Sequence, residues 1–247
     1  NLGAKYDGTQ SNITFNVYSS RATRIEVWLY KTASGAQEVV RYVLTKNATT
    51  NVWSKTTSVS TLQGTYGITG TVYYGYRAWG PNWPYNSSWT KGSGTGFVSD
   101  VDASGNRFNP NKLLLDPYAV EISQDPNTAS CSDGTLYATG ASHRNKDSGA
   151  CAPKGLVLVA NTASIGTKPT RALKDDIVYE VHVRGLTKGD TSMAASLRGT
   201  YAGAAAKAGY LAGIGVTAVE FLPVQETQND TNEVDPNSDS GDNYWGY

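Results

Sequence analysis

The chain has 247 residues, of which 21 are Lys or Arg and 21 are Asp or Glu. A formal net charge of zero without a basic block argues against a nucleic-acid-binding protein, whose affinity needs clustered positive charge. No apolar run approaches the roughly 18 residues of a membrane span, and the patterned apolar segments can bury a sizeable core, so membrane-spanning and disordered classes are also excluded.

The first 79 residues carry the pattern of short strands. Apolar and polar residues alternate in Asn12–Ser19 and Thr23–Tyr30, and further candidates are Gln37–Leu44, Val52–Thr56 and Val72–Trp79. Period-two alternation of β-branched and aromatic residues indicates half-buried strands. Several short strands at near-regular spacing, without a helical pattern, predict an immunoglobulin-like β-sandwich, although the strand order stays open.

The segment from Trp79 to about Pro169 lacks a regular period and is rich in turn residues. Loops of this length in compact folds are usually functional or fixed against another part of the protein. Within the segment, Asp100–Gly105 imitates the opening of an EF-hand calcium loop, but the twelfth position is Asn111 instead of a glutamate. We therefore interpret it as an Asx-type turn.

Cys131 and Cys151 are the only cysteines, and they bracket a loop rich in Ser, Asp and Gly. They are either a disulfide of an exported protein or two unrelated free thiols. The disulfide is favoured, and closing a loop of about 20 residues would stabilise the fold by about 3 kcal/mol. A charged content of only 17%, with abundant Gly, Tyr and Trp, also favours an extracellular location.

A second domain is predicted near the C-terminus. Asp176–Arg184 and Val216–Val224 are apolar strand candidates, and Gly203–Gly213 between them is a helix candidate. A strand, a helix and a strand with nearly continuous apolar strands predict a parallel βαβ unit buried on both faces. A closed (β/α)8 barrel needs roughly 250 residues, so we expect the front portion of a longer protein. The predicted domains are a sandwich with long wrapped loops over 1–160, a linker over 161–175, and the incomplete start of a barrel over 176–247.

Five segments carry a resemblance to a known family, and they are spread over the chain: Tyr73–Pro81, Phe108–Tyr118, Tyr179–Gly185, Val219–Val224 and Tyr244–Tyr247. They resemble the bacterial isoamylases, which are secreted starch-debranching enzymes of the α-amylase superfamily of retaining glycoside hydrolases. The resemblance implies an N-terminal sandwich related to starch-binding modules, followed by a calcium-bearing (β/α)8 barrel. It also implies a branched α-glucan substrate, amylopectin or glycogen, whose α-1,6 linkages are hydrolysed. Independently of the resemblance, we expect a monomer.

The retaining mechanism needs two carboxylates about 5–5.5 Å apart, which this family carries after later barrel strands. Because those strands are not in residues 1–247, we assign no catalytic residue, and we interpret Asp175, Glu180 and Glu220 as structural. The alternative function is a non-catalytic starch- or glycogen-binding module. The segment from Asp176 to Tyr247 argues against it, because a free-standing module has no use for exposed parallel strands. Within the enzyme class the nearest rival is a cytoplasmic glycogen-debranching enzyme, and the paired cysteines favour the secreted protein.

The resemblance also implies site residues. Asp125, Glu226, Thr227 and Asn229 match positions that bind calcium in isoamylases, and calcium takes oxygen ligands of these types. The alternative is an Asp-Pro turn and an ordinary polar βα loop. Tyr247 matches a tyrosine that stacks against the sugar beside the scissile bond, and the alternative is a core aromatic.

Two further sets of residues have competing interpretations. The tryptophans Trp79, Trp83 and Trp89 could form a starch-binding platform, but the Pro and Gly residues between them suit a rigid wrapped loop, so we predict packing. We also predict that His182 is a satisfied core histidine inside a strand, because apolar residues surround it in the sequence.

Overall fold

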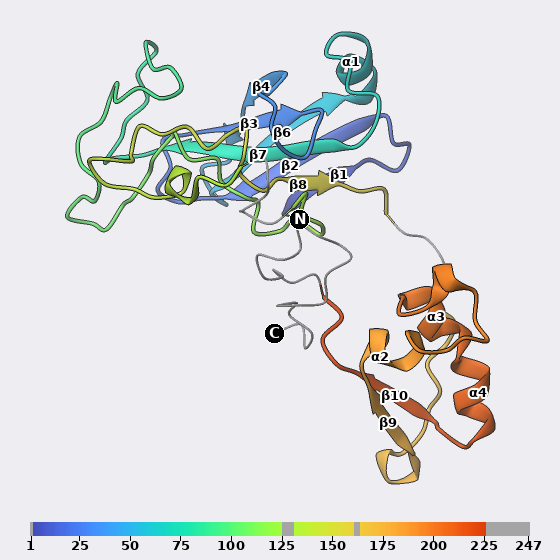
Figure 1. Ribbon diagram of the computed structural model, residues 1–247. Coiled ribbons are helices and arrows are strands. Elements are labelled where there is room, and N and C mark those ends of the chain that lie inside the picture. The colour runs from blue at the N-terminus through green and yellow to red at the C-terminus, as the bar shows by residue number, and fades with distance from the viewer. Residues whose placement is uncertain (1, 125–130, 161–163, 226–247) are drawn as a thin grey trace. The chain divides into compact units, whose positions relative to one another are not determined.

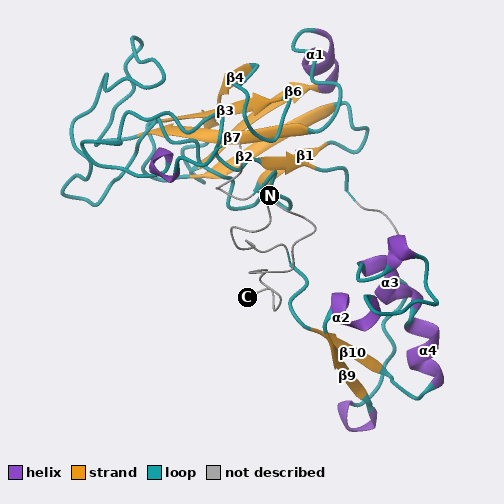
Figure 2. Cartoon of the chain, in the orientation of Figure 1, coloured by secondary structure: helices purple, strands orange, loops and turns teal. Residues whose placement is uncertain are grey.

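The computed structural model describes residues 2–124, 131–160 and 164–225. The chain divides into two compact units, Asn1–Asn161 and Thr162–Tyr247, which are described separately below (Figures 1 and 2). No helix among the described residues is long and apolar enough to cross a membrane.

The first unit is a β-sandwich of two antiparallel sheets, as predicted. One sheet has the order β1-β2-β6-β5, with bounds Gly3–Tyr6, Asn12–Tyr18, Val52–Ser58 and Thr45–Lys46. The other has the order β4-β3-β7-β8, with bounds Val40–Val43, Arg24–Tyr30, Val72–Trp79 and Gly155–Val157. The central pairs β2/β6 and β3/β7 are each in register over seven residues, from Asn12↔Ser58 to Tyr18↔Val52 and from Arg24↔Trp79 to Tyr30↔Tyr73.

The main core lies between the two sheets. Ile13 and Phe15 of β2 are fully buried in one cluster with Val27 and Leu29 of β3. These residues occupy alternate positions of their strands, so the period-two pattern correctly gives the inward-facing set. Burial of their apolar surface is the main force that holds the two sheets together.

Four short elements of this unit were not predicted from the sequence: β1, β5, β8 and the helix α1 (Val59–Gly64). The helix begins after Ser58, whose side chain accepts a hydrogen bond from the N–H of Thr61 at 3.1 Å. Among its residues only Leu62 is buried, so there is no helical repeat of apolar residues to detect. The capping serine was the available signal.

Residues 80–154, except for the undescribed residues 125–130, form what we call the loop layer. It contains one 3₁₀ turn, η1 (Gly134–Leu136), and is otherwise irregular in its described part, as predicted. It is attached to the second sheet by isolated bridges between Leu114 and Tyr76 and between Ile122 and Gly155.

The second unit contains a parallel strand pair, as predicted for a βαβ unit. Strand β9 (Val178–Val181) pairs with β10 (Ala218–Phe221), and Glu180 lies opposite Glu220. The helices between them are α2 (Val183–Thr187), α3 (Tyr201–Ala206) and α4 (Ala208–Gly213), and there are 3₁₀ turns at η2 (Leu173–Asp175) and η3 (Ala195–Leu197).

Three details of the second unit correct the sequence analysis. The single helix predicted over Gly203–Gly213 is two helices, with Lys207 between them. The first strand ends before His182, which is not inside a strand: its Nδ1 accepts the N–H of Gly185 at 3.2 Å and caps α2. The strands are also not buried on both faces, since Val178 is 48% and Phe221 44% exposed. The described sheet has two strands, so neighbouring strands cover little of these residues.

Candidate functional site

The residues assigned to calcium and substrate binding, Asp125, Glu226, Thr227, Asn229 and Tyr247, all lie outside the described residues. Their roles therefore stay predictions. Within the described ranges, no group of three or more His, Cys, Asp or Glu side chains could hold a metal ion. The features that the described residues do form are the loop layer on the sandwich and an apolar groove in the second unit.

The tryptophans of the loop layer are packing residues, which confirms that prediction. Trp79, Trp83 and Trp89 are 0%, 1% and 6% exposed and belong to a second core cluster with Trp28 of β3. The rings of Trp79 and Trp89 meet edge to face, with centroids 5.2 Å apart. This cluster lies on the outer face of the second sheet, so that face is covered by the loop layer and offers none of these rings to a ligand.

Arg77 anchors the loop layer on β7. Its side chain is fully buried, and it donates to the carbonyl oxygen of Pro110 and to a carboxylate oxygen of Asp147, both at 2.6 Å. Its guanidinium also lies 4.2 Å from the ring centroid of Trp28. A buried charge is tolerated when it is paired and hydrogen-bonded, so these contacts connect two distant loop segments to one strand.

Two buried lysines hold the backbone of the same layer. Lys154 Nζ donates to the carbonyl oxygens of Ala33, Ala150 and Ala152 at 2.9, 3.3 and 2.9 Å. Lys112 Nζ donates in the same way to the carbonyl oxygens of Leu136, His143 and Lys146 at 2.7 to 2.9 Å. Burial lowers the pKa of each ammonium from 10.5 to about 8. Each ammonium group therefore holds three backbone carbonyls together.

Sequence reasoning missed these three cations. The available signal for Arg77 was its alternate position with Tyr73, Gly75 and Trp79 in a strand, which places an arginine on an aromatic face. No comparable pattern marks Lys112 or Lys154, because their partners are backbone carbonyls of remote segments.

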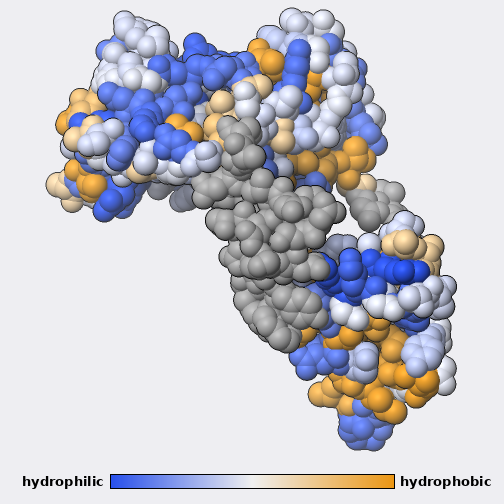
Figure 3. Space-filling view, in the orientation of Figure 1, coloured by the Kyte–Doolittle hydropathy of each residue, from blue (hydrophilic) through white to orange (hydrophobic). Residues whose placement is uncertain are grey.

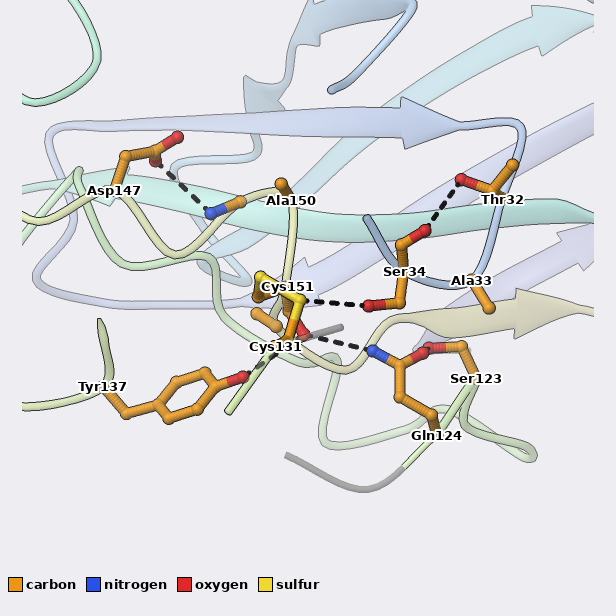
Figure 4. Close-up of a disulfide and its surroundings, with 12 residues drawn as sticks. Thr32, Ala33, Ser34, Ser123, Gln124, Cys131, Tyr137, Asp147, Ala150 and Cys151 are labelled. Carbon is orange, nitrogen blue, oxygen red and sulfur yellow. Dashed lines mark hydrogen bonds between the residues drawn. A yellow bond between two sulfur atoms is a disulfide. The ribbon is translucent and has the colours of Figure 1, made fainter. Parts of the chain in front are cut away.

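Cys131 and Cys151 form a disulfide, with Cα atoms 5.5 Å apart (Figure 4). The carbonyl oxygen of Cys151 accepts hydrogen bonds from Gln124 Nε2 at 3.1 Å and from the Tyr137 hydroxyl at 3.2 Å. Ser34 Oγ, in the turn after β3, lies 3.3 Å from Cys131 Sγ. The disulfide therefore cross-links the second half of the loop layer at the place where it contacts the turn after β3.

Asp102 forms an Asx-type turn, as predicted, and not a calcium loop. Its Oδ1 accepts the N–H groups of Ser104 and Asn106 at 2.9 Å, and its Oδ2 accepts Asn106 Nδ2 at 2.7 Å. These bonds, above all the one from the Asn106 side chain, hold the pKa of the Asp102 carboxyl below its usual value. Both carboxylate oxygens are engaged within the turn.

An apolar groove of about 500 Å³ lies in the second unit. Its lining comes from α2, α3, α4, β10 and Val224, and it includes Tyr201, Leu211 and Phe221. Figure 3 shows that hydrophobic residues gather on the exposed surface of this unit. Such a contiguous apolar surface is typical of an element that packs against more protein.

The sequence was compared with known families and proteins. Residues 1–119 match the profile of carbohydrate-binding module 48, described as the isoamylase N-terminal domain. The whole chain is 71% identical over 246 residues to an isoamylase of a Flavobacterium species and covers 32% of it. It is 65% identical to the isoamylase of Pseudomonas amyloderamosa, of which it covers 31%, and 32% identical to a glycogen debranching enzyme of Yersinia enterocolitica, of which it covers 32%.

Solved structures support the fold. The catalytic module of the pneumococcal glycogen-degrading virulence factor SpuA matches 92% of the chain with a TM-score of 0.58 at 22% identity, and the chain covers 27% of it. The pullulanase SAP of group B Streptococcus, solved with maltotetraose, matches 92% of the chain with a TM-score of 0.57 at 20% identity, and the chain covers 24% of it. At such identities the likeness concerns the fold alone.

The resemblance to bacterial isoamylases is therefore confirmed over the whole chain, and residues 1–119 match the family model of carbohydrate-binding module 48. The chain spans about a third of the length of the curated relatives it matches.

Proposed function

We propose that the chain is the N-terminal portion of a secreted glycoside hydrolase that cleaves α-1,6 branch linkages of amylopectin and glycogen. The observation that carries this proposal is the 71% identity to an isoamylase across the entire chain, over both compact units. A carbohydrate-binding module alone would account for residues 1–119 only.

The second unit supports the enzyme assignment because it has the form of the first βα units of a (β/α)8 barrel. Strands β9 and β10 are parallel and connected through helices, which is the repeating unit of that barrel. Their exposed apolar side chains and the apolar groove suit contact with further strands and helices. In this proposal the two catalytic carboxylates follow later barrel strands and act by a retaining mechanism at a separation of about 5–5.5 Å.

A calcium ion is part of the proposal. The donor set Asp125, Glu226, Thr227 and Asn229 offers carboxylate, hydroxyl, carbonyl and amide oxygens, which are the ligands that calcium prefers. When bound, the ion would supply a positive charge that these oxygen ligands balance. Tyr247 would contact the sugar beside the scissile bond with its ring.

The extracellular location and the monomeric state also remain proposals. The disulfide supports export, because structural disulfides persist in oxidising compartments and are rare in the cytosol.

The alternative function is a non-catalytic starch- or glycogen-binding module, and the match of residues 1–119 to a carbohydrate-binding family favours it. The parallel pair argues against that alternative, since a binding module gains nothing from open strand edges.

The test is an assay for new reducing ends released from amylopectin and from glycogen. The full-length protein that contains this sequence is expected to release them, whereas the 247-residue chain is expected to release none. A full-length protein that leaves amylopectin intact would refute the proposed activity. Activity of the 247-residue chain would refute the placement of the carboxylates.

A further inference from the structure

A small open cleft of about 60 Å³ lies in the loop layer and has no role in the function proposed above. Its lining comes from segments that are far apart in the sequence: Trp83, residues 100–101, residues 107–109 and Thr139. A volume of this size holds about four water molecules. It can therefore admit the edge of a small polar ring, but not a whole oligosaccharide.

The cleft is preformed, because the side-chain amides of Asn82, which is buried, and of Asn109 connect its walls. Asn82 Nδ2 donates to the carbonyl oxygens of Ser99 at 3.0 Å and of Phe108 at 2.9 Å, and Asn82 Oδ1 accepts the N–H of Phe108 at 2.9 Å. Asn109 Nδ2 donates to the carbonyl oxygen of Arg144 at 3.1 Å, which fixes a third segment. A ligand would therefore find the walls already in place and would lose little free energy in ordering them.

Polar groups with unused hydrogen-bonding capacity line this cleft. One carboxylate oxygen of Asp100 accepts a hydrogen bond from Arg144 at 2.7 Å, while the other has no hydrogen-bond partner in the described part of the chain. The guanidinium of Arg107 and the hydroxyl of Thr139 likewise have none there. The cleft therefore offers a free anionic acceptor together with free donors.

This combination selects the chemistry of a ligand. An anion such as phosphate would be attracted by Arg107 but repelled by Asp100, and a metal ion would be repelled by Arg107 and Arg144. A neutral vicinal diol can bind both charged groups without being repelled by either. One of its hydroxyls donates a hydrogen bond to the carboxylate, and the oxygen of the neighbouring hydroxyl accepts one from the guanidinium. The apolar side chains of Phe108 and Val101 are placed to contact the C–H groups of a sugar ring.

We propose that this cleft binds the edge of one glucose unit of an α-glucan chain. The choice of the α-glucan, among neutral diols, rests on the proposed function. The site would hold the polymer on the loop layer and away from the outer sheet face, where the tryptophans are buried.

The experiment is a nuclear magnetic resonance titration of the isotope-labelled 247-residue chain with maltoheptaose, and in parallel with inorganic phosphate. We expect maltoheptaose to shift the amide signals of residues 100–101, 107–109 and 139 and the indole N–H signal of Trp83. Arg107→Ala should weaken this binding at least about fivefold, because a hydrogen bond from a charged donor is lost. Arg107→Lys should restore part of the affinity, since it returns a cationic donor without the planar fork.

The matched control is Lys5→Ala, which removes an exposed cation from β1 on the other sheet. It should leave the affinity unchanged. Shifts confined to other residues, no shift at saturating sugar, or an unchanged affinity of Arg107→Ala would overturn the cleft as a glucan site, as would stronger binding of phosphate at the same residues. None of these results would bear on debranching by the full-length protein, so the two proposals fail independently.

Discussion

Because of the two buried lysines of the loop layer, we predict that the free energy of unfolding increases as the pH rises above neutrality. Burial lowers the pKa of Lys112 and Lys154 to about 8 in the folded chain, against 10.5 for an ordinary lysine. Between these two values the unfolded state binds more protons than the folded state. The free energy of unfolding must then rise with pH in this interval, because stability increases wherever the unfolded state holds the excess of protons.

The magnitude follows from the two pKa values. Between about pH 7 and about pH 9 each lysine contributes a rise of about 1 kcal/mol, and the two together contribute between about 2 and 3 kcal/mol. Buried tyrosines set the upper limit of the window. Burial raises the pKa of Tyr30, Tyr74 and Tyr76 above the usual 10, so their contribution to stability is lost as the unfolded chain ionises near pH 10. At about pH 9 this loss amounts to only about 0.2 kcal/mol.

Urea denaturation at both pH values measures the effect, with tryptophan fluorescence as the probe because the second core cluster is rich in tryptophan. Lys154→Met should lose about half of the pH-dependent rise, whatever its stability at about pH 7. The control Lys5→Met removes an exposed lysine and should keep the whole rise. A free energy of unfolding that stays level or falls over this range, or an equal rise in Lys154→Met, would refute the reasoning.

Three further outcomes are expected. Cys131→Ser opens a loop with a sequence separation of 20 and should lower the free energy of unfolding by about 3 kcal/mol in urea denaturation; no loss would contradict the stabilising role of the disulfide. Gly203→Ala places a Cβ 2.0 Å from the carbonyl oxygen of Leu197 and should cost at least about 2 kcal/mol, whereas the control Gly209→Ala, which meets no atom within 4 Å, should be neutral or stabilising. In the full-length protein a calcium chelator should lower the Tm, and Glu226→Gln should reduce that shift; a chelator without effect on the Tm would count against the metal site.

The sandwich was predictable because its strands carry local signals. Ile13 and Phe15 alternate with polar residues, and Val27 and Leu29 lie among β-branched and aromatic neighbours, so period two gives both the strand and its buried face. Strands too short to show this alternation were missed. One example is β8, which is only three residues long and is defined by its pairing with β7. A strand of this kind depends on long-range pairing and leaves no local trace.

The anchors of the loop layer could not be predicted for the same reason. Lys154 Nζ donates to the carbonyl oxygen of Ala33, which lies 121 residues earlier in the chain. A lysine in a loop is usually solvated, and nothing near Lys154 in the sequence indicates that three carbonyls will surround it. His182 shows the converse failure: its apolar neighbours predict a strand, but its ring nitrogen accepts a backbone N–H and begins a helix there.

The loop layer also constrains where the first unit can contact glucan. Trp79 and Trp83 are adjacent in the sequence to glycine and proline and could have formed an exposed stacking platform, but both are buried: Trp79 packs edge to face against Tyr85 and Trp89, and Trp83 against Phe97. A sugar that stacked on these rings would have to displace the aromatic side chains of the loop layer that pack against them. Exposing those packed rings to water costs more than one stacking contact returns. Any contact between this unit and glucan must then use the outer surface of the loop layer or the exposed faces of the sandwich, and this is why the rigid cleft beside Arg107 is the place to test first.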